Sequence, residues 1–150
     1  MSPDEVSHPD CHAARTPQGY IHFQFLKISD ETLNAWRVLH HNMYTHPEQY
    51  RMVCMLIDLP KENLMPFAHI TSYAKAYISG GEPFLPTRHA FVTDAALPIE
   101  LIQGMVKTLP AIDLQAMFYK TAERDDAVAW LLSEIDEINS SAAGTTPPGS

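Results

Sequence analysis

Histidine and cysteine are the residues of this sequence that could bind a metal or attack a substrate. The chain has eight histidines and two cysteines. Two short groups stand out, which are His8, Cys11 and His12, and His40, His41 and His46. Tetrahedral zinc needs three or four converging ligands, whereas adjacent residues on a helix do not face each other. We therefore predict no metal site, with histidines scattered over the surface and the helix ends, and an inert buried thiol at Cys54.

Asp58 is the candidate for acid–base or ligand-binding chemistry. It follows the apolar run 52–57, which has the pattern of a strand that is covered on both faces. Ligands of open α/β sheets bind beyond the carboxyl ends of the strands, where Thr93 and Asp94 are also expected. A general base needs a positioned partner as well. A turn or helix-cap role for Asp58 is the simpler alternative.

Four more residues could bind a small amphiphile together with Asp58. Tyr73 and Tyr77 share a predicted helix, Phe84 follows it, and Arg88 begins the next predicted strand. Aromatic walls with a few polar groups are typical of small-molecule sites. Core packing of the aromatic rings and a solvated arginine are the alternative. We predict no catalytic residue and no cofactor, and no phosphorylation site can be assigned.

Several nucleotide-binding and hydrolase motifs are absent from the sequence. There is no Gly-x-x-x-x-Gly-Lys-Ser/Thr loop and no Gly-x-Gly-x-x-Gly after the first predicted strand. No Gly-x-Ser-x-Gly elbow occurs either. The sequence therefore contains no motif that indicates a common type of nucleotide-binding site or a serine hydrolase.

The elements that must position these residues alternate between strand and helix periodicity. Strands are predicted at 20–28, 52–57, 88–93 and 114–119, and helices at 29–46, 66–79, 98–109 and 121–139. Trp36 and Trp130 are expected to anchor the core. Strands separated by helices indicate an α/β fold. We predict a four- to five-strand mixed sheet with helices packed on it and right-handed crossovers.

The two ends of the chain differ from its middle. Residues 1–19 contain Pro3, Pro9 and Pro17 and almost no large apolar side chain, and residues 140–150 are small and polar. Such segments bury too little apolar area to offset the entropy lost on ordering. We therefore predict a flexible tail at 1–19, one domain at 20–139, and a second tail at 140–150.

The overall charge is acidic. Ten Lys and Arg against 18 Asp and Glu give a net charge of −8, which disfavours nucleic-acid binding. No stretch approaches the length of a membrane span, and the acidic start of the chain lacks the apolar core of a secretory signal. We expect a cytoplasmic location.

Residues 25–132 resemble the STAS-like family of bacterial anti-sigma-factor-antagonist-like proteins, in the subgroup described as STAS or CRAL-TRIO-like domains. The resemblance lies in segments 36–40, 56–58, 67–77 and 88–92, and above all in 118–131. That last segment combines an aromatic strand end, an acidic helix start and the motif Ala-x-x-Trp-Leu.

The resemblance implies a mixed sheet covered by helices and a non-enzymatic regulator that docks on partner proteins. Some relatives are switched by phosphorylation of a serine beside the helix that follows a core strand. Here Asp58 is followed by Leu-Pro-Lys-Glu-Asn, without a Ser-Ser-Gly type of turn. No phosphorylation site is therefore transferred.

Three functional hypotheses follow. The first is a regulatory or protein-interaction module that forms a homo-oligomer or binds a protein partner. The second, suggested by the aromatic residues near the second helix and by lipid-binding relatives of this architecture, is a domain that binds a small amphiphile or lipid. The third is an enzyme that uses Asp58 or a histidine pair.

Overall fold

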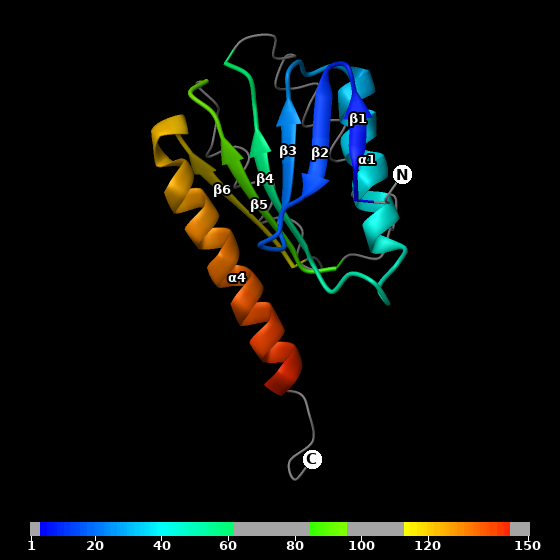
Figure 1. Ribbon diagram of the computed structural model, residues 1–150, viewed down its shortest axis with the longest axis vertical. Coiled ribbons are helices and arrows are strands. Elements are labelled where there is room, and N and C mark those ends of the chain that lie inside the picture. The colour runs from blue at the N-terminus through cyan, green and yellow to red at the C-terminus, as the bar shows by residue number, and fades with distance from the viewer. Residues whose placement is uncertain (1–3, 62–84, 96–112, 145–150) are drawn as a thin grey trace.

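The computed structural model describes residues 4–61, 85–95 and 113–144, with side chains described as far as residue 140 (Figure 1). Its strands are β1 (Val6–His8), β2 (Cys11–Arg15), β3 (Ile21–Phe25), β4 (Val53–Asp58), β5 (Thr87–Val92) and β6 (Leu114–Tyr119). Its helices are α1 (Asp30–Tyr44), the short 3-10 helix η1 (Thr121–Glu123) and α4 (Arg124–Gly144).

The strands form one mixed sheet in the order β1-β2-β3-β4-β5-β6. The first three strands pair antiparallel, and β3 to β6 pair parallel. This confirms the predicted α/β fold and mixed sheet, with six strands in place of four to five. The parallel strands β3 and β4 are connected through α1, as in a β-α-β unit.

The prediction of a flexible tail at 1–19 is wrong, because β1 and β2 lie in this segment. Pro9 lies in the two-residue turn between them, and Pro17 lies in the turn between β2 and β3. Gly19 gives that second turn its positive φ of 107°. The prolines therefore mark hairpin turns. Strand β2 contributes only small side chains to the core, those of Cys11 and Ala13, which explains why this segment lacks large apolar residues.

The C-terminal tail was predicted to begin at residue 140, but α4 continues to Gly144. Its first turn carries Asp125 and Asp126, as the sequence predicts, and acidic residues there are favourable to the helix dipole. Residues 145–150 lie outside the described part of the chain.

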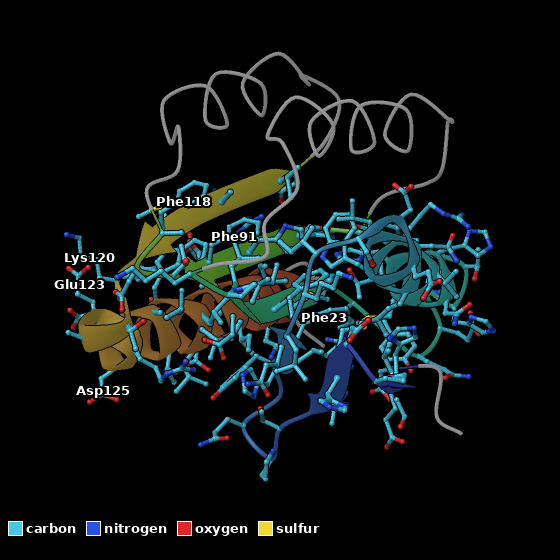
Figure 2. The ribbon with its side chains drawn as sticks, turned by 90° about the horizontal axis from the view of Figure 1, so that it is seen from above. Phe23, Phe91, Phe118, Lys120, Glu123 and Asp125 are labelled. Carbon is cyan, nitrogen blue, oxygen red and sulfur yellow. The ribbon has the colours of Figure 1, made fainter. Side chains whose placement is uncertain are left out.

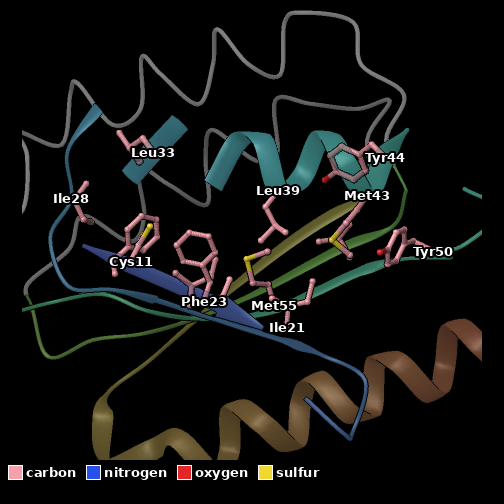
Figure 3. Packing of buried hydrophobic residues seen from close by; sticks show 14 residues of the cluster. Cys11, Ile21, Phe23, Ile28, Leu33, Leu39, Met43, Tyr44, Tyr50 and Met55 are labelled. Atoms are coloured by element: carbon pink, nitrogen blue, oxygen red, sulfur yellow. The ribbon is translucent and has the colours of Figure 1, made fainter. Parts of the chain in front are cut away.

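The larger core lies between the sheet and α1 (Figure 3). Ile21 and Phe23 on β3 and Met55 on β4 are fully buried there and meet Leu39 of α1. The helix is capped by Ser29, whose side chain accepts a hydrogen bond from the Thr32 N–H. Cutting a core side chain such as that of Phe23 back to alanine costs about 3–5 kcal/mol of stability.

A second core lies on the opposite face of the sheet, under α4. Ala127 and Leu131 of α4 pack against Cys54 and Leu56 of β4. Burial raises the pKa of the Cys54 thiol to about 12, which agrees with an inert buried cysteine. Trp130 is only partly buried at the margin of this core.

The predicted helices at 66–79 and 98–109 lie outside the described residues. Of the helices that the structure does describe, none is long and apolar enough to span a membrane.

Candidate functional site

Asp58 lies at the carboxyl end of β4, where its carboxylate binds two cationic or potentially cationic side chains. His22 Nε2 lies 2.5 Å from Asp58 Oδ2. The Arg124 guanidinium donates to both oxygens, with Nη1 3.1 Å from Oδ2 and Nη2 bonded to Oδ1. This two-pronged geometry is the strong form of an arginine–carboxylate pair. We call these three residues the Asp58 cluster.

The local fold explains why the three side chains meet. The parallel register of β3 and β4 places His22 beside Leu56, two residues before Asp58 and therefore on the same face. Arg124 is the first residue of α4, which packs on that face. The exposed side-chain fractions are 40% for His22, 39% for Arg124 and 15% for Asp58. The cluster thus joins the sheet to the start of α4 at the water boundary.

The electrostatics of this cluster disfavour proton abstraction by Asp58. Burial by itself would raise the pKa of Asp58, but the hydrogen bonds from His22 and Arg124 outweigh it and the pKa lies below its usual value. Such a carboxylate is a weak base near neutral pH. Both of its oxygens already accept hydrogen bonds within the chain.

Arg88 also lies on the α4 face, near the other end of the sheet. It is in register with Cys54, four residues before Asp58. Its guanidinium pairs with Asp113 at 2.8 Å and with Glu134 of α4 at 3.4 Å. Burial would lower the pKa of Arg88, but these two carboxylates outweigh that effect and raise it.

Of the predicted ligand residues, the structure describes only Asp58 and Arg88, and it does not bring these two together. Asp58 and Arg88 lie at opposite ends of β4 and β5, each within its own ion-pair cluster. The side chain of Arg88 is buried, although a solvated arginine was the simpler expectation. Tyr73, Tyr77 and Phe84 lie outside the described residues. The predicted amphiphile site stays a prediction.

Thr93 and Asp94 follow β5 at the expected edge and make local contacts. Thr93 Oγ1 accepts from the Ala95 N–H at 3.0 Å. Asp94 Oδ1 accepts from the Thr121 N–H at 3.0 Å. Thr121 begins η1, and the long helix predicted over 121–139 begins at Arg124.

A buried polar cluster that the sequence patterns did not predict lies between α1 and β5. It contains Trp36, His40 and Tyr44 of α1 and Thr87 and His89 of β5, and we call it the histidine seam. The Nε2 atoms of His40 and His89 are 2.9 Å apart, and Tyr44 Oη lies 2.7 Å from Thr87 Oγ1. The ring centroids of Trp36 and His89 lie 5.6 Å apart. The expectation of surface or helix-end histidines is wrong for His40 and His89, which are only 1% and 6% exposed.

The hydrogen bonds of the seam fix where its protons lie. His40 Nδ1 lies 2.7 Å from the Trp36 carbonyl oxygen, which can only accept, so Nδ1 donates; in the neutral ring Nε2 then accepts from His89 Nε2. Thr87 donates to the Leu85 carbonyl, so the Tyr44 hydroxyl donates to Thr87. Burial lowers the pKa of His40 to about 4 and that of His89 well below its usual value. The pair is therefore neutral at pH 7.

One sequence signal could have located the seam. Trp36, His40 and Tyr44 follow each other at four-residue intervals and so share a helix face. Thr87 and His89 are two residues apart on β5 and so share a sheet face. Polar residues at inward positions of both elements indicate a buried hydrogen-bonded contact.

The histidine–cysteine group near the N-terminus does not converge. Cys11 is fully buried toward α1, whereas His12 is exposed and His8 lies 3.4 Å from Glu31. Within residues 4–61, 85–95 and 113–144, no group of three or more His, Cys, Asp or Glu side chains could hold a metal ion.

The two edges of the sheet differ in length and chemistry. The edge strand β1 has only three residues. The other edge strand, β6, has six residues without a charge, Leu-Gln-Ala-Met-Phe-Tyr, and within the described chain its one neighbour is β5. Met117 on this strand is 40% exposed. Phe118 stacks on Phe91 of β5, with ring centroids 5.1 Å apart (Figure 2).

Backbone direction divides the polar groups of β6 between its two sides. The Asp113 and Tyr119 carbonyls accept from the Thr87 and Thr93 N–H groups, so odd-numbered residues face β5. Backbone groups alternate along a strand, and those of Leu114, Ala116 and Phe118 therefore point outward. This outer edge of β6 is a template for a further strand.

Comparison with known proteins gives no assignment: no family model, curated protein or solved structure matches this chain.

Proposed function

We propose that this chain is a non-enzymatic regulatory or protein-interaction module of STAS-like type, which binds another polypeptide by strand addition at the outer edge of β6. The observation that carries the proposal is the uncharged, six-residue edge of β6 with its outward N–H and C=O groups. An extended partner strand gains affinity from main-chain hydrogen bonds at such an edge.

The contrast with β1 supports this assignment. Natural proteins shorten or charge the edge strands that must not pair. A three-residue strand such as β1 offers little to a partner. In β6 none of these protective features occurs among its six residues, and Gln115 and Met117 leave apolar and amide surface exposed.

The ion-pair clusters support a non-catalytic role. The lowered pKa of Asp58 and the engagement of both its oxygens make it a poor base or nucleophile. Arg88 is likewise engaged by Asp113 and Glu134. Each of these predicted site residues ties α4 to the sheet, which gives both a structural explanation.

The test uses a synthetic peptide with the sequence of residues 113–120, titrated into the isotope-labelled full chain and followed by amide NMR. We expect the largest shifts at Leu114, Ala116 and Phe118, whose N–H groups point outward. The variant Ala116→Pro removes one outward donor without removing a bond to β5, and it should weaken peptide binding at least tenfold.

The matched control is Gln115→Ala, which trims an exposed side chain of the same strand and leaves every backbone donor in place. It should bind the peptide as the wild type does. Absence of peptide-induced shifts at the outer edge of β6 even with the peptide in large excess, or equal binding by Ala116→Pro, would refute strand addition.

A further inference from the structure

We infer that the partner strand is β6 of a second copy of this chain, paired antiparallel about a two-fold axis at Ala116. The inference rests on the proposed function and names the partner. The pairing would join two sheets edge to edge, with α1 of both copies on one face and α4 of both copies on the other.

The register follows from the outward backbone groups. Leu114, Ala116 and Phe118 are spaced symmetrically about Ala116. Antiparallel pairing centred there places Leu114 opposite Phe118 of the second copy and pairs the outward N–H and C=O groups of all three residues. A shift by two residues leaves one outward-facing residue of each strand beyond the pairing. The central register therefore satisfies the most backbone groups.

Charge at the strand ends selects the antiparallel direction. Asp113 precedes β6 and its side chain is 55% exposed, while the exposed Lys120 follows the strand (Figure 2). Antiparallel pairing brings Asp113 of one copy to the end at which Lys120 of the other lies. Parallel pairing would place the two carboxylates together. Since the chain carries a net charge of −8, the uncharged β6 is also a surface at which a second copy meets little repulsion.

The exposed side chains of β6 fit the same arrangement. Gln115 and Met117 both lie on the α4 face of the strand. In the central register each Gln115 lies opposite Met117 of the second copy, as a pair without direct backbone hydrogen bonds, where side chains approach closely. The Met117 side chain, which is 40% exposed in the single chain, thereby becomes more buried in both copies.

The symmetry explains why such an assembly would stop at two chains. A two-fold contact uses the same surface on both copies and closes on itself. The remaining edges of the joined sheet are the two β1 strands, each of three residues. The dimer therefore leaves no long edge open for further growth.

Cysteine cross-linking tests both the contact and its register. We expect a mixture of the Gln115→Cys and Met117→Cys variants to form a covalent dimer on mild oxidation, because these positions face each other. Each variant alone should give less than a tenth of that yield. A dimer from Met117→Cys alone would place the axis at residue 117 and overturn the central register.

Sedimentation velocity of the full chain tests the assembly without cross-linking. We expect a wild-type dimer and a monomer for Met117→Lys, which alters an exposed side chain and leaves the fold intact. Gln24→Lys, at an exposed position of the central strand β3, is the matched control and should remain dimeric. A monomeric wild type that still binds the 113–120 peptide would overturn self-association alone, whereas loss of peptide binding would overturn the proposed function itself.

Discussion

Polar clusters on opposite faces of the sheet are in opposite electrostatic states. On the α4 face, Asp58 and Arg88 are charged and lie in ion-pair clusters. On the α1 face, His40 and His89 are neutral and share a single hydrogen bond. The difference corresponds to exposure to water. Arg124 and Asp113 are substantially exposed, whereas both histidines of the seam are buried.

The comparison shows how this fold accommodates polar side chains next to an apolar core. Removing a charge from water carries a large penalty unless a close partner compensates it. Where partners of opposite charge are near, the α4 face retains the ions. At His40 and His89, none of the described side chains supplies an opposite charge, and the pair stays neutral with fixed proton positions.

The largest effect is expected from Arg88→Ala. This change leaves the carboxylates of Asp113 and Glu134 without their shared cation, and Glu134 is largely buried. We expect a loss of about 3–5 kcal/mol in the free energy of unfolding, as for other broken buried ion pairs. Urea denaturation at pH 7 measures it. Arg88→Lys keeps one charge and should recover part of the loss, and a loss below about 1 kcal/mol would show that the α4 face does not depend on this ion pair.

The stability contributed by the His40–His89 pair and that contributed by Asp58 should be lost to acid in different pH ranges. The pKa of His40 falls from 6.5 to about 4 on folding, so the unfolded chain binds more protons between these values and stability decreases as pH falls through them. At 1.36 kcal/mol for each pKa unit, the loss is roughly 3 kcal/mol by pH 4. The pKa of Asp58 is lowered from 3.8, so the stability that this carboxylate contributes is lost only as the pH falls below about 3.8.

Urea denaturation at pH 7, 5.5 and 4.5 follows the acid response of the histidine seam. The double variant His40→Leu/His89→Leu has no titrating group there and should show a clearly flatter pH profile. If wild type and double variant lose stability in parallel between pH 7 and 4.5, the neutral pair is not the source of the acid sensitivity.

A double-mutant cycle measures the interaction between the two histidines of the seam. His89→Leu leaves His40 Nε2 without its donor, and His40→Leu leaves the His89 N–H without its acceptor. Each single change should cost about 1–3 kcal/mol, because an unsatisfied buried polar group is expensive. The double change should cost less than the sum. Tyr44→Phe, which leaves both histidines in place, serves as the control within the seam. If the losses of stability in the two single histidine variants add up to the loss in the double variant, the two histidines do not interact.

The strands with large apolar side chains were predictable from the sequence, whereas the N-terminal hairpin was not. Alternation along β3 and the apolar run of β4 indicate strands directly. Strand β2 buries Cys11 and Ala13, which are too small to produce a strong apolar signal, and the nearby prolines suggested disorder. Pairing with β3 decides its structure, and pairing between strands is a tertiary effect that local propensity does not contain.

The candidate site was predictable in position but not in its partners. Asp58 could be placed at the carboxyl edge of the sheet by a general rule of parallel sheets. Its partners His22 and Arg124 are 36 and 66 residues away in sequence, and the two histidines of the seam are 49 residues apart. Such contacts depend on strand order and register, which the sequence pattern left open.

The smallest effect is expected from Asp58→Asn. The amide keeps the shape of the carboxylate and loses its charge toward His22 and Arg124, both of which are partly exposed. Water screens such pairs, and we expect a loss of about 1 kcal/mol. High salt should reduce this loss, since exposed ion pairs are screened by ions, while the loss in Arg88→Ala should change little. Urea denaturation of both variants at 0.05 and 1 M sodium chloride makes the comparison. A loss in Asp58→Asn as large as in Arg88→Ala, and insensitive to salt, would mean that the carboxyl edge is as dry as the amino-terminal end of the sheet, and that exposure does not separate the two ion-pair clusters.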